Sequence, residues 1–191
     1  MPRGSSSIAG MVPEAPLEAT DTGLVAAGDG WFVLNSREGR WHHAEGRGAV
    51  LPFEGDVDFP QVGVNLYVLP PGVAMSMYHW EADQEDFLVL AGEALLLVAG
   101  EERPLRQWDF VHCPPGTNHD VIGAGDGPCV VLAIGAREHQ DEATWGGYPV
   151  DEVALRHNAG AKQETSVAAE AYAGLPRRKP TPYQEGWLPE S

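Results

Sequence analysis

Glycine and proline divide this chain into many short apolar segments, and this division limits the folds open to it. The 191 residues include 23 glycines and 16 prolines, spread along the whole length. Between them lie short runs rich in Val, Leu, Phe and Tyr, a pattern typical of short strands joined by tight turns. The chain is therefore predicted to be all-β, as a sandwich or barrel.

The apolar runs give the positions of the predicted strands. These are residues 30–35, 63–69, 75–80, 86–90, 93–98, 103–105, 109–113, 120–122 and 128–135. The runs between residues 86 and 98 are apolar nearly throughout, which predicts strands buried on both faces. The outer face of such a strand must pack against another apolar surface. A second copy of the chain could supply that surface, so we expect a homodimer, although the chain's own tails are equally able to supply it.

After residue 136 the short apolar runs give way to helix-forming and proline-rich segments. Residues 151–160 are predicted to form a short helix with Asp151 as its N-cap, and residues 165–173 a second one. The proline-rich segment that follows predicts an extended arm, anchored by Tyr183, Trp187 and Leu188. We therefore expect a flexible tail at 1–20, a β-barrel at 21–136, and a helical and extended arm at 137–191 that packs on the barrel.

Charge and composition exclude several kinds of partner. The net charge of −16 repels phosphate backbones, so we expect neither nucleic acid nor anionic membrane as a partner. No apolar run has the length of a bilayer span, no signal peptide is recognisable, and the two cysteines, Cys113 and Cys129, suit small buried positions. These features predict a cytoplasmic protein. The basic triplet 177–179 is expected to be a solvated patch rather than a phosphate site, which is the alternative.

One spacing of polar residues predicts a metal site. His79 and Glu81 are two apart and share a face if the segment is a strand. Glu85 opens the next strand, and a Pro-Pro-Gly turn precedes His119. Two imidazoles and two carboxylates can converge on one divalent ion. The alternative is a solvated acidic turn beside structural histidines. The other histidines lack such a spacing and are taken as non-ligands; they are residues 42, 43, 112, 139 and 157.

The segment around His79 resembles the first conserved motif of the cupin superfamily. That motif reads Gly, five residues, His-x-His, three or four residues, Glu, six residues, Gly. Here Gly72 is followed by six residues, His79-x-Glu81, three residues, Glu85, six residues and Gly92. The resemblance implies that Glu81 stands where relatives have a second histidine.

The segment around His119 resembles the second cupin motif, which reads Gly, five residues, Pro-x-Gly, two residues, His, three residues, Asn. Here the positions are Trp108, five residues, Pro114-x-Gly116, two residues, His119, three residues and Gly123. The resemblance implies a cupin double-stranded β-helix, also described as a jelly-roll or RmlC-like barrel. The short C-terminal helices and the extended arm predicted above would follow this barrel. The resemblance also implies His79, Glu81, Glu85 and His119 as the metal-binding set.

The resemblance and the residues together lead to a functional hypothesis. A second carboxylate makes the set of ligands harder in the sense of metal coordination, and this favours Zn, Fe or Mn over Cu(I). One carboxylate can ligate while Glu81 serves as a catalytic base, which suits a dioxygenase or an isomerase or epimerase acting on a small molecule. The alternatives are a non-catalytic metal-binding sensor or storage protein, and a ligand-binding module with a degenerate site. The predicted pocket residues are apolar or aromatic: Tyr67, Met75, Met77, Phe87, Phe110 and Val121.

Overall fold

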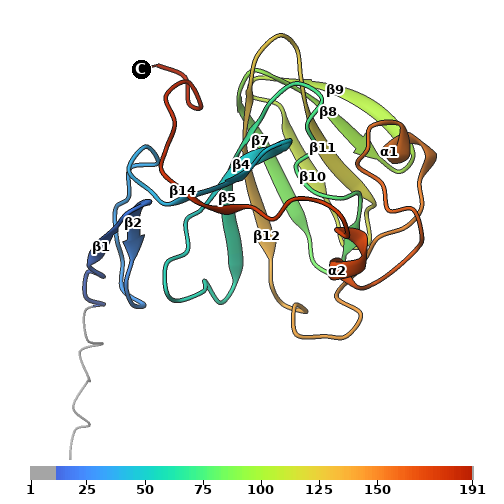
Figure 1. Cartoon of the computed structure of the whole chain (residues 1–191). Coiled ribbons are helices and arrows are strands. Elements are labelled where there is room, and N and C mark those ends of the chain that lie inside the picture. Colours follow the sequence, from blue (N-terminus) through green and yellow to red (C-terminus); the bar gives the residue numbers. More distant parts are fainter. Residues whose placement is uncertain (1–11, 191) are drawn as a thin grey trace, which may run out of the picture.

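The computed structural model describes residues 12–190, and β-strands dominate it (Figure 1). The helices are α1 (Glu152–Arg156) and α2 (Ala168–Ala171). The strands are β1 (Leu17–Thr20), β2 (Gly23–Ala26), β3 (Trp41–Ala44), β4 (Arg47–Pro52), β5 (Val62–Leu69), β6 (Trp80–Glu81), β7 (Glu85–Ala91), β8 (Glu93–Val98), β9 (Glu101–Arg106), β10 (Phe110–Cys113), β11 (His119–Ala124), β12 (Cys129–Ala136), β13 (Gly146–Gly147) and β14 (Lys179–Thr181). The predicted all-β class is confirmed.

Two sheets form the body of the fold. The larger has the order β10-β7-β12-β5-β4-β3-β14 and the smaller the order β11-β8-β9. Isolated antiparallel bridges, Ala74 with Ile122 and His79 with His119, hold the segment before β6 beside β11. The pair β6–β13 lies at the end of this segment. Every strand pair in the two main sheets is antiparallel.

The main core is built from the strand faces that point between the sheets. In β8, Ala94 and Leu96 belong to this core, while Leu97 belongs to a cluster on the other face, as the two-residue period of a strand requires. The buried members of the core are Leu69, Met75, Phe87, Val89, Ala94, Leu96, Val111, Cys113, Val121, Cys129, Val131 and Ala133. Each fully buried Leu, Val or Phe side chain stabilises the fold by roughly 1.5–3 kcal/mol relative to an exposed one.

The chain's own later segments cover the outer faces of both sheets. Tyr183, Trp187 and Leu188 pack against the outer cluster of the larger sheet, where Trp41 is completely buried. Ala154 of α1 packs with Leu97 on the smaller sheet. In Figure 1 the last segment runs from α2 back to β14, which pairs with β3 at the edge of the larger sheet. In the structure the arm residues Tyr183, Trp187 and Leu188 thus lie on the larger sheet. A homodimer stays a prediction.

The predicted and observed elements differ most near the N-terminus. Residues 30–35 are not a strand, because only Trp31 forms a bridge there and Val33 is 78% exposed, without a partner strand or a core to face. Strands β1 to β4 were not predicted, and β1 lies within the segment expected to be a tail. Residues 1–11 of that segment lie outside the described residues.

The predicted helices are present but shorter than expected. Asp151 is the N-cap of α1, and its Oδ1 accepts a hydrogen bond of 2.9 Å from the Ala154 backbone N–H. The helix ends at Arg156 because Asn158 adopts a left-handed conformation with φ of 56°, two residues before Gly160. Both cysteines are free and buried in the core. Within residues 12–190, no helix has the length and apolarity needed to cross a membrane.

Candidate metal centre

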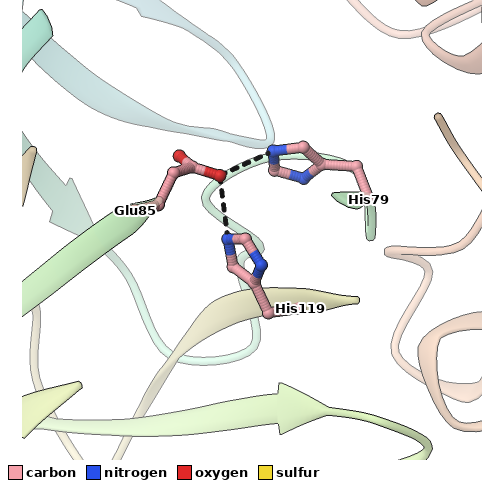
Figure 2. A group of neighbouring side chains, drawn as sticks. All are labelled: His79, Glu85 and His119. Atoms are coloured by element: carbon pink, nitrogen blue, oxygen red, sulfur yellow. Dashed lines mark ion pairs between the residues drawn. The ribbon is translucent and has the colours of Figure 1, made fainter. Parts of the chain in front are cut away.

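Three side chains from separate segments converge inside the fold. His79 and His119 are antiparallel bridge partners, linked by His79 N–H to His119 O at 3.1 Å and His119 N–H to His79 O at 2.8 Å. Glu85 opens β7 opposite them. Its Oε2 lies 3.3 Å from His79 Nε2 and 3.1 Å from His119 Nε2, as Figure 2 shows. The three residues can each offer one ligand atom to a common ion.

Backbone carbonyls fix how the two imidazole rings face this point. Nδ1 of His79 lies 2.8 Å from Met77 O, and Nδ1 of His119 lies 2.8 Å from Thr117 O. A carbonyl only accepts, so each Nδ1 carries the donating proton. In the neutral rings each Nε2 then presents a lone pair toward Glu85, which is the tautomer that binds a metal.

The buried atoms at the centre lack aligned hydrogen bonds. Among the described residues, His119 Nε2 and Glu85 Oε2 are buried without a hydrogen-bond partner, although only 3.1 Å separates them. Two lone-pair-bearing atoms at that separation repel unless a cation lies near both. The arrangement therefore fits a divalent ion bound by two imidazole nitrogens and a carboxylate oxygen.

Without an ion, protons supply the missing positive charge. Burial lowers the pKa of His79, but the carboxylates of Glu81 and Glu85, which both lie near its Nε2, outweigh burial and raise the pKa to about 10. Burial likewise lowers the pKa of His119, and its proximity to Cys113 and to the Glu85 carboxylate raises it to about 10. Burial raises the pKa of Glu85, and both histidines bring it down to about 2.

Glu81 lies at the edge of this centre. Its Oε1 is 3.5 Å from His79 Nε2, and it is not one of the three residues that share a common point. Burial raises its pKa above the usual value, although the nearby His79 lowers it in part. Of the four residues predicted as the metal set, the structure thus brings three together and places Glu81 beside them.

A cavity of about 250 Å³ opens from the metal centre. Tyr67, Met75 and Phe87 line it, as does Glu81. The predicted residues Met77, Phe110 and Val121 do not. Val121 is fully buried in the core, and Met77 lines a separate cleft of about 940 Å³ beside residues 155–175.

Strand alternation explains why Phe110 is not a cavity residue. In β10 the side chains of Val111 and Cys113 point into the core, so Phe110 and His112 point outward. The Phe110 side chain is accordingly 64% exposed. The prediction that Phe110 lines the pocket is therefore wrong. It considered only that Phe110 is apolar, and not which face of the strand its side chain occupies.

The cavity also has polar walls that the apolar pattern did not predict. The additional lining side chains come from β5, from the segments before β6 and after β12, and from the C-terminal region: Asn65, Ser76, Arg137, Trp145, Tyr148 and Tyr172. Arg137 is held there by Glu54, which accepts hydrogen bonds from both Nη1 and Nη2. Its charge is therefore already balanced, and it shapes the rim more than it attracts an anion.

Tyr148 is brought to the metal centre by the β6–β13 pair. Gly146 and Gly147 pair with Glu81 and Trp80, and a Cβ on Gly147 would lie only 2.8 Å from Trp80 Nε1. This close approach places the Tyr148 ring against the His79 imidazole, with centroids 5.8 Å apart and planes at 27°. The C-terminal region thus closes one side of the cavity.

Comparison with known proteins places the centre in a family. A family model described as "Cupin domain" matches residues 65–135. This segment is a cupin domain. It includes His79, together with Glu85 on β7 and His119 on β11, and the predicted cupin double-stranded β-helix is confirmed. No curated protein matches the chain.

Solved structures give partial matches to the cupin domain. A putative sugar phosphate isomerase from Acidithiobacillus ferrooxidans has 25% identity and a TM-score of 0.46, with 50% of this chain and 66% of that one covered. A cupin-superfamily sugar phosphate isomerase from Silicibacter pomeroyi has 29% identity and a TM-score of 0.42, with 47% and 59% covered. KdgF from Halomonas sp. has 17% identity and a TM-score of 0.47, with 56% and 94% covered. The chain thus spans less than two thirds of the first two structures.

Two departures from the cupin motifs have a structural explanation. Trp108 stands at a motif glycine position and keeps a left-handed backbone, with φ of 75°. Gly123 stands at the motif asparagine position, where a Cβ would lie 2.3 Å from Pro70 O. Any side chain at 123 would therefore collide with the backbone. Both changes lie away from the metal-facing atoms.

The described residues contain a second group of potential metal ligands, but these side chains are already hydrogen-bonded to each other or exposed to solvent. Asp83, Glu138 and His139 have ligand atoms close together. Asp83 already accepts hydrogen bonds from His139 Nδ1 at 2.6 Å and from the His139 backbone N–H at 2.9 Å. Glu138 is exposed. These contacts tie the segment after β12 to the turn before β7, so His139 serves as an anchor for that segment.

Proposed function

We propose that the chain is a metal-dependent cupin enzyme that moves a proton on a small carbonyl compound, as an isomerase or epimerase does. His79, Glu85 and His119 hold one divalent ion, Zn, Fe or Mn. The observation that carries the proposal is the convergence of His79 Nε2 and His119 Nε2 on Glu85 Oε2 beside Glu81. When bound, the ion supplies the positive charge that polarises a carbonyl oxygen.

Glu81 is the proposed base. It lines the cavity, lies next to the metal centre, and has a raised pKa because it is buried. A carboxylate whose pKa is raised toward neutrality is a better proton acceptor than an ordinary one. Its carboxylate takes the proton from the carbon next to the carbonyl, and its carboxylic acid returns a proton to the same or the neighbouring carbon.

The cavity supports a small polar substrate. Its volume is about 250 Å³, and hydroxyl and amide groups line it, including Asn65, Ser76 and Tyr148. Tyr148 closes the side near His79, which keeps water away from the reacting carbon. We extend the proposal to a cytoplasmic location, consistent with two free cysteines, and to a substrate that is a small molecule.

The test is solvent deuterium exchange. The metal-loaded protein is incubated in D₂O with a panel of aldoses, ketoses and α-hydroxy acids, and deuterium at the α-carbon is followed by NMR. We expect exchange into at least one compound, and Glu81→Gln should lower its rate by about 100-fold or more while metal content stays at the wild-type level.

Four outcomes would contradict the proposal. Deuterium exchange at the wild-type rate in Glu81→Gln would show that Glu81 is not the base. Full metal binding with exchange into none of the panel would support the non-catalytic sensor or storage protein instead, and oxygen consumption with the same panel would support a dioxygenase. A Glu81→Gln protein that loses metal as completely as His79→Ala would make Glu81 a ligand.

A further inference from the structure

Arginine side chains gather in a second cleft that is separate from the metal centre. The cleft has a volume of about 470 Å³ and lies between the start of β4 and the segment after α2. Arg47, Arg177 and Arg178 line it, together with Tyr172 and neighbouring small residues. Three of the chain's 12 basic residues therefore meet in one place, in a protein with 28 acidic residues.

These arginines lack the carboxylate partners found elsewhere in the fold. Arg103, Arg137 and Arg156 each form an ion pair with a glutamate. Within residues 12–190, none of the three cleft arginines forms one. Like charges that share a cleft repel each other, so an anion from outside the chain would stabilise the arrangement.

Neutral groups hold two of the guanidinium groups in place. Arg178 donates from Nε to Gly48 O at 2.8 Å and from Nη2 to Met75 O at 3.0 Å. Arg47 lies over the Tyr172 ring at 5.2 Å and donates to Pro176 O at 3.4 Å. Carbonyl oxygens orient a guanidinium without cancelling its charge, and each group keeps N–H donors for another acceptor.

Arg178 shows that the positive charge in the cleft is not compensated. Burial lowers its pKa, and the charge of Arg47 adds to that effect, while Tyr67, Tyr172 and Asp120 oppose it only in part. Arg178 does not form an ion pair with Asp120. A cation that is partly withdrawn from water, fixed in direction and short of a counter-charge is suited to binding an oxyanion.

We propose that Arg47, Arg177 and Arg178 bind a phosphate dianion, either free or as the phosphoryl group of a small molecule. Three cations match a dianion better than a single carboxylate, and planar guanidinium groups match phosphoryl oxygens in pairs. Tyr172 lines both this cleft and the metal cavity, so one aromatic ring separates the bound anion from that cavity. The proposal stands whether or not the proposed activity does.

The test is a calorimetric titration of the full chain with inorganic phosphate at constant ionic strength, and a parallel titration with glycerol phosphate. We expect saturable binding at one site per chain. Arg177→Gln and Arg47→Gln should each weaken it by about tenfold or more, because each loses charge-assisted hydrogen bonds. Arg106→Gln is the matched control, since Arg106 is exposed on β9 and away from the cleft.

The comparison of the two ligands identifies the source of the phosphoryl group. Tighter binding of glycerol phosphate indicates a phosphorylated small molecule, and tighter binding of phosphate indicates the free ion. Equal affinities in wild type, Arg177→Gln and Arg106→Gln, or a titration that does not saturate, would overturn the proposal. Arg177 is exposed, so Arg177→Gln should keep the fold. This variant therefore tests the proposal even if Arg47→Gln fails to fold.

Discussion

At the scale of single residues, the two histidines owe their role to backbone contacts. Met77 O and Thr117 O each hold an Nδ1 at 2.8 Å, which turns both Nε2 atoms toward Glu85. Replacing Glu85 or either histidine would leave buried polar atoms facing each other without a counter-charge. The metal-binding set is therefore cooperative, and its members should not be replaceable one at a time.

The first residue-scale prediction concerns metal content. Untagged wild-type protein should carry about one divalent ion per chain by mass spectrometry of the metals, and His119→Ala should lose most of it, since it removes one of three ligands. His112→Ala is the control, because His112 is a half-exposed histidine that pairs with Asp86 on another face. Equal metal content in wild type and His119→Ala would refute the assigned site.

The second residue-scale prediction concerns pH. The pKa values of about 10 mean that His79 and His119 hold protons at neutral pH in the metal-free chain, and a metal must displace them. Metal affinity should therefore rise with pH, by roughly tenfold per unit for each proton displaced, from about pH 7 until it levels near pH 10. Competition titrations across this range measure it, and a flat profile would show that the histidines are already neutral.

At the scale of elements, the C-terminal arm acts as part of the core. Trp187 packs on the fully buried Trp41, with ring centroids 5.2 Å apart, and Tyr183 meets both rings. The arm thereby covers the outer face of the larger sheet, which would otherwise expose apolar side chains to water. Its proline-rich sequence predicted the extended form, and its aromatic residues supply the binding energy.

The prediction at this scale is that the arm contributes measurably to stability. Trp187→Ala should lower the free energy of unfolding by about 2–3 kcal/mol in urea denaturation, because it opens a cavity over Trp41. Trp31→Ala, at a tryptophan that is 53% exposed, should change it by no more than about 0.5 kcal/mol. Similar effects of the two substitutions would mean that the arm is not docked on the sheet in solution.

At the scale of the whole molecule, the chain covers its own apolar faces. The outer cluster of the larger sheet lies under the arm, and that of the smaller sheet lies under the segment of α1. These faces are the reason for expecting a homodimer. Because the chain's own segments cover them, the apolar strands no longer require a second copy, and the homodimer stays a prediction. The two sites, a metal centre and an arginine cleft, meet at Tyr172, so the C-terminal region shapes both.

The sequence alone predicted the features that depend on local pattern. Glycine and proline spacing gave most strands of the cupin domain, and the motifs around His79, Glu85 and His119 named the three residues that converge. Asp151 was recognised as an N-cap, since capping depends on neighbouring residues only. Such features follow from backbone geometry within a few residues, so they can be seen in the chain itself.

Only the tertiary structure decided which distant residues share a site. Tyr148 and Tyr172 line the metal cavity, and Arg47 and Arg178 line one cleft, because segments far apart in the sequence pack together. The exposed position of Phe110 and the absence of a strand at 30–35 also depend on which partner each segment finds. Side-chain convergence of this kind is set by packing of the whole fold, and no local spacing encodes it.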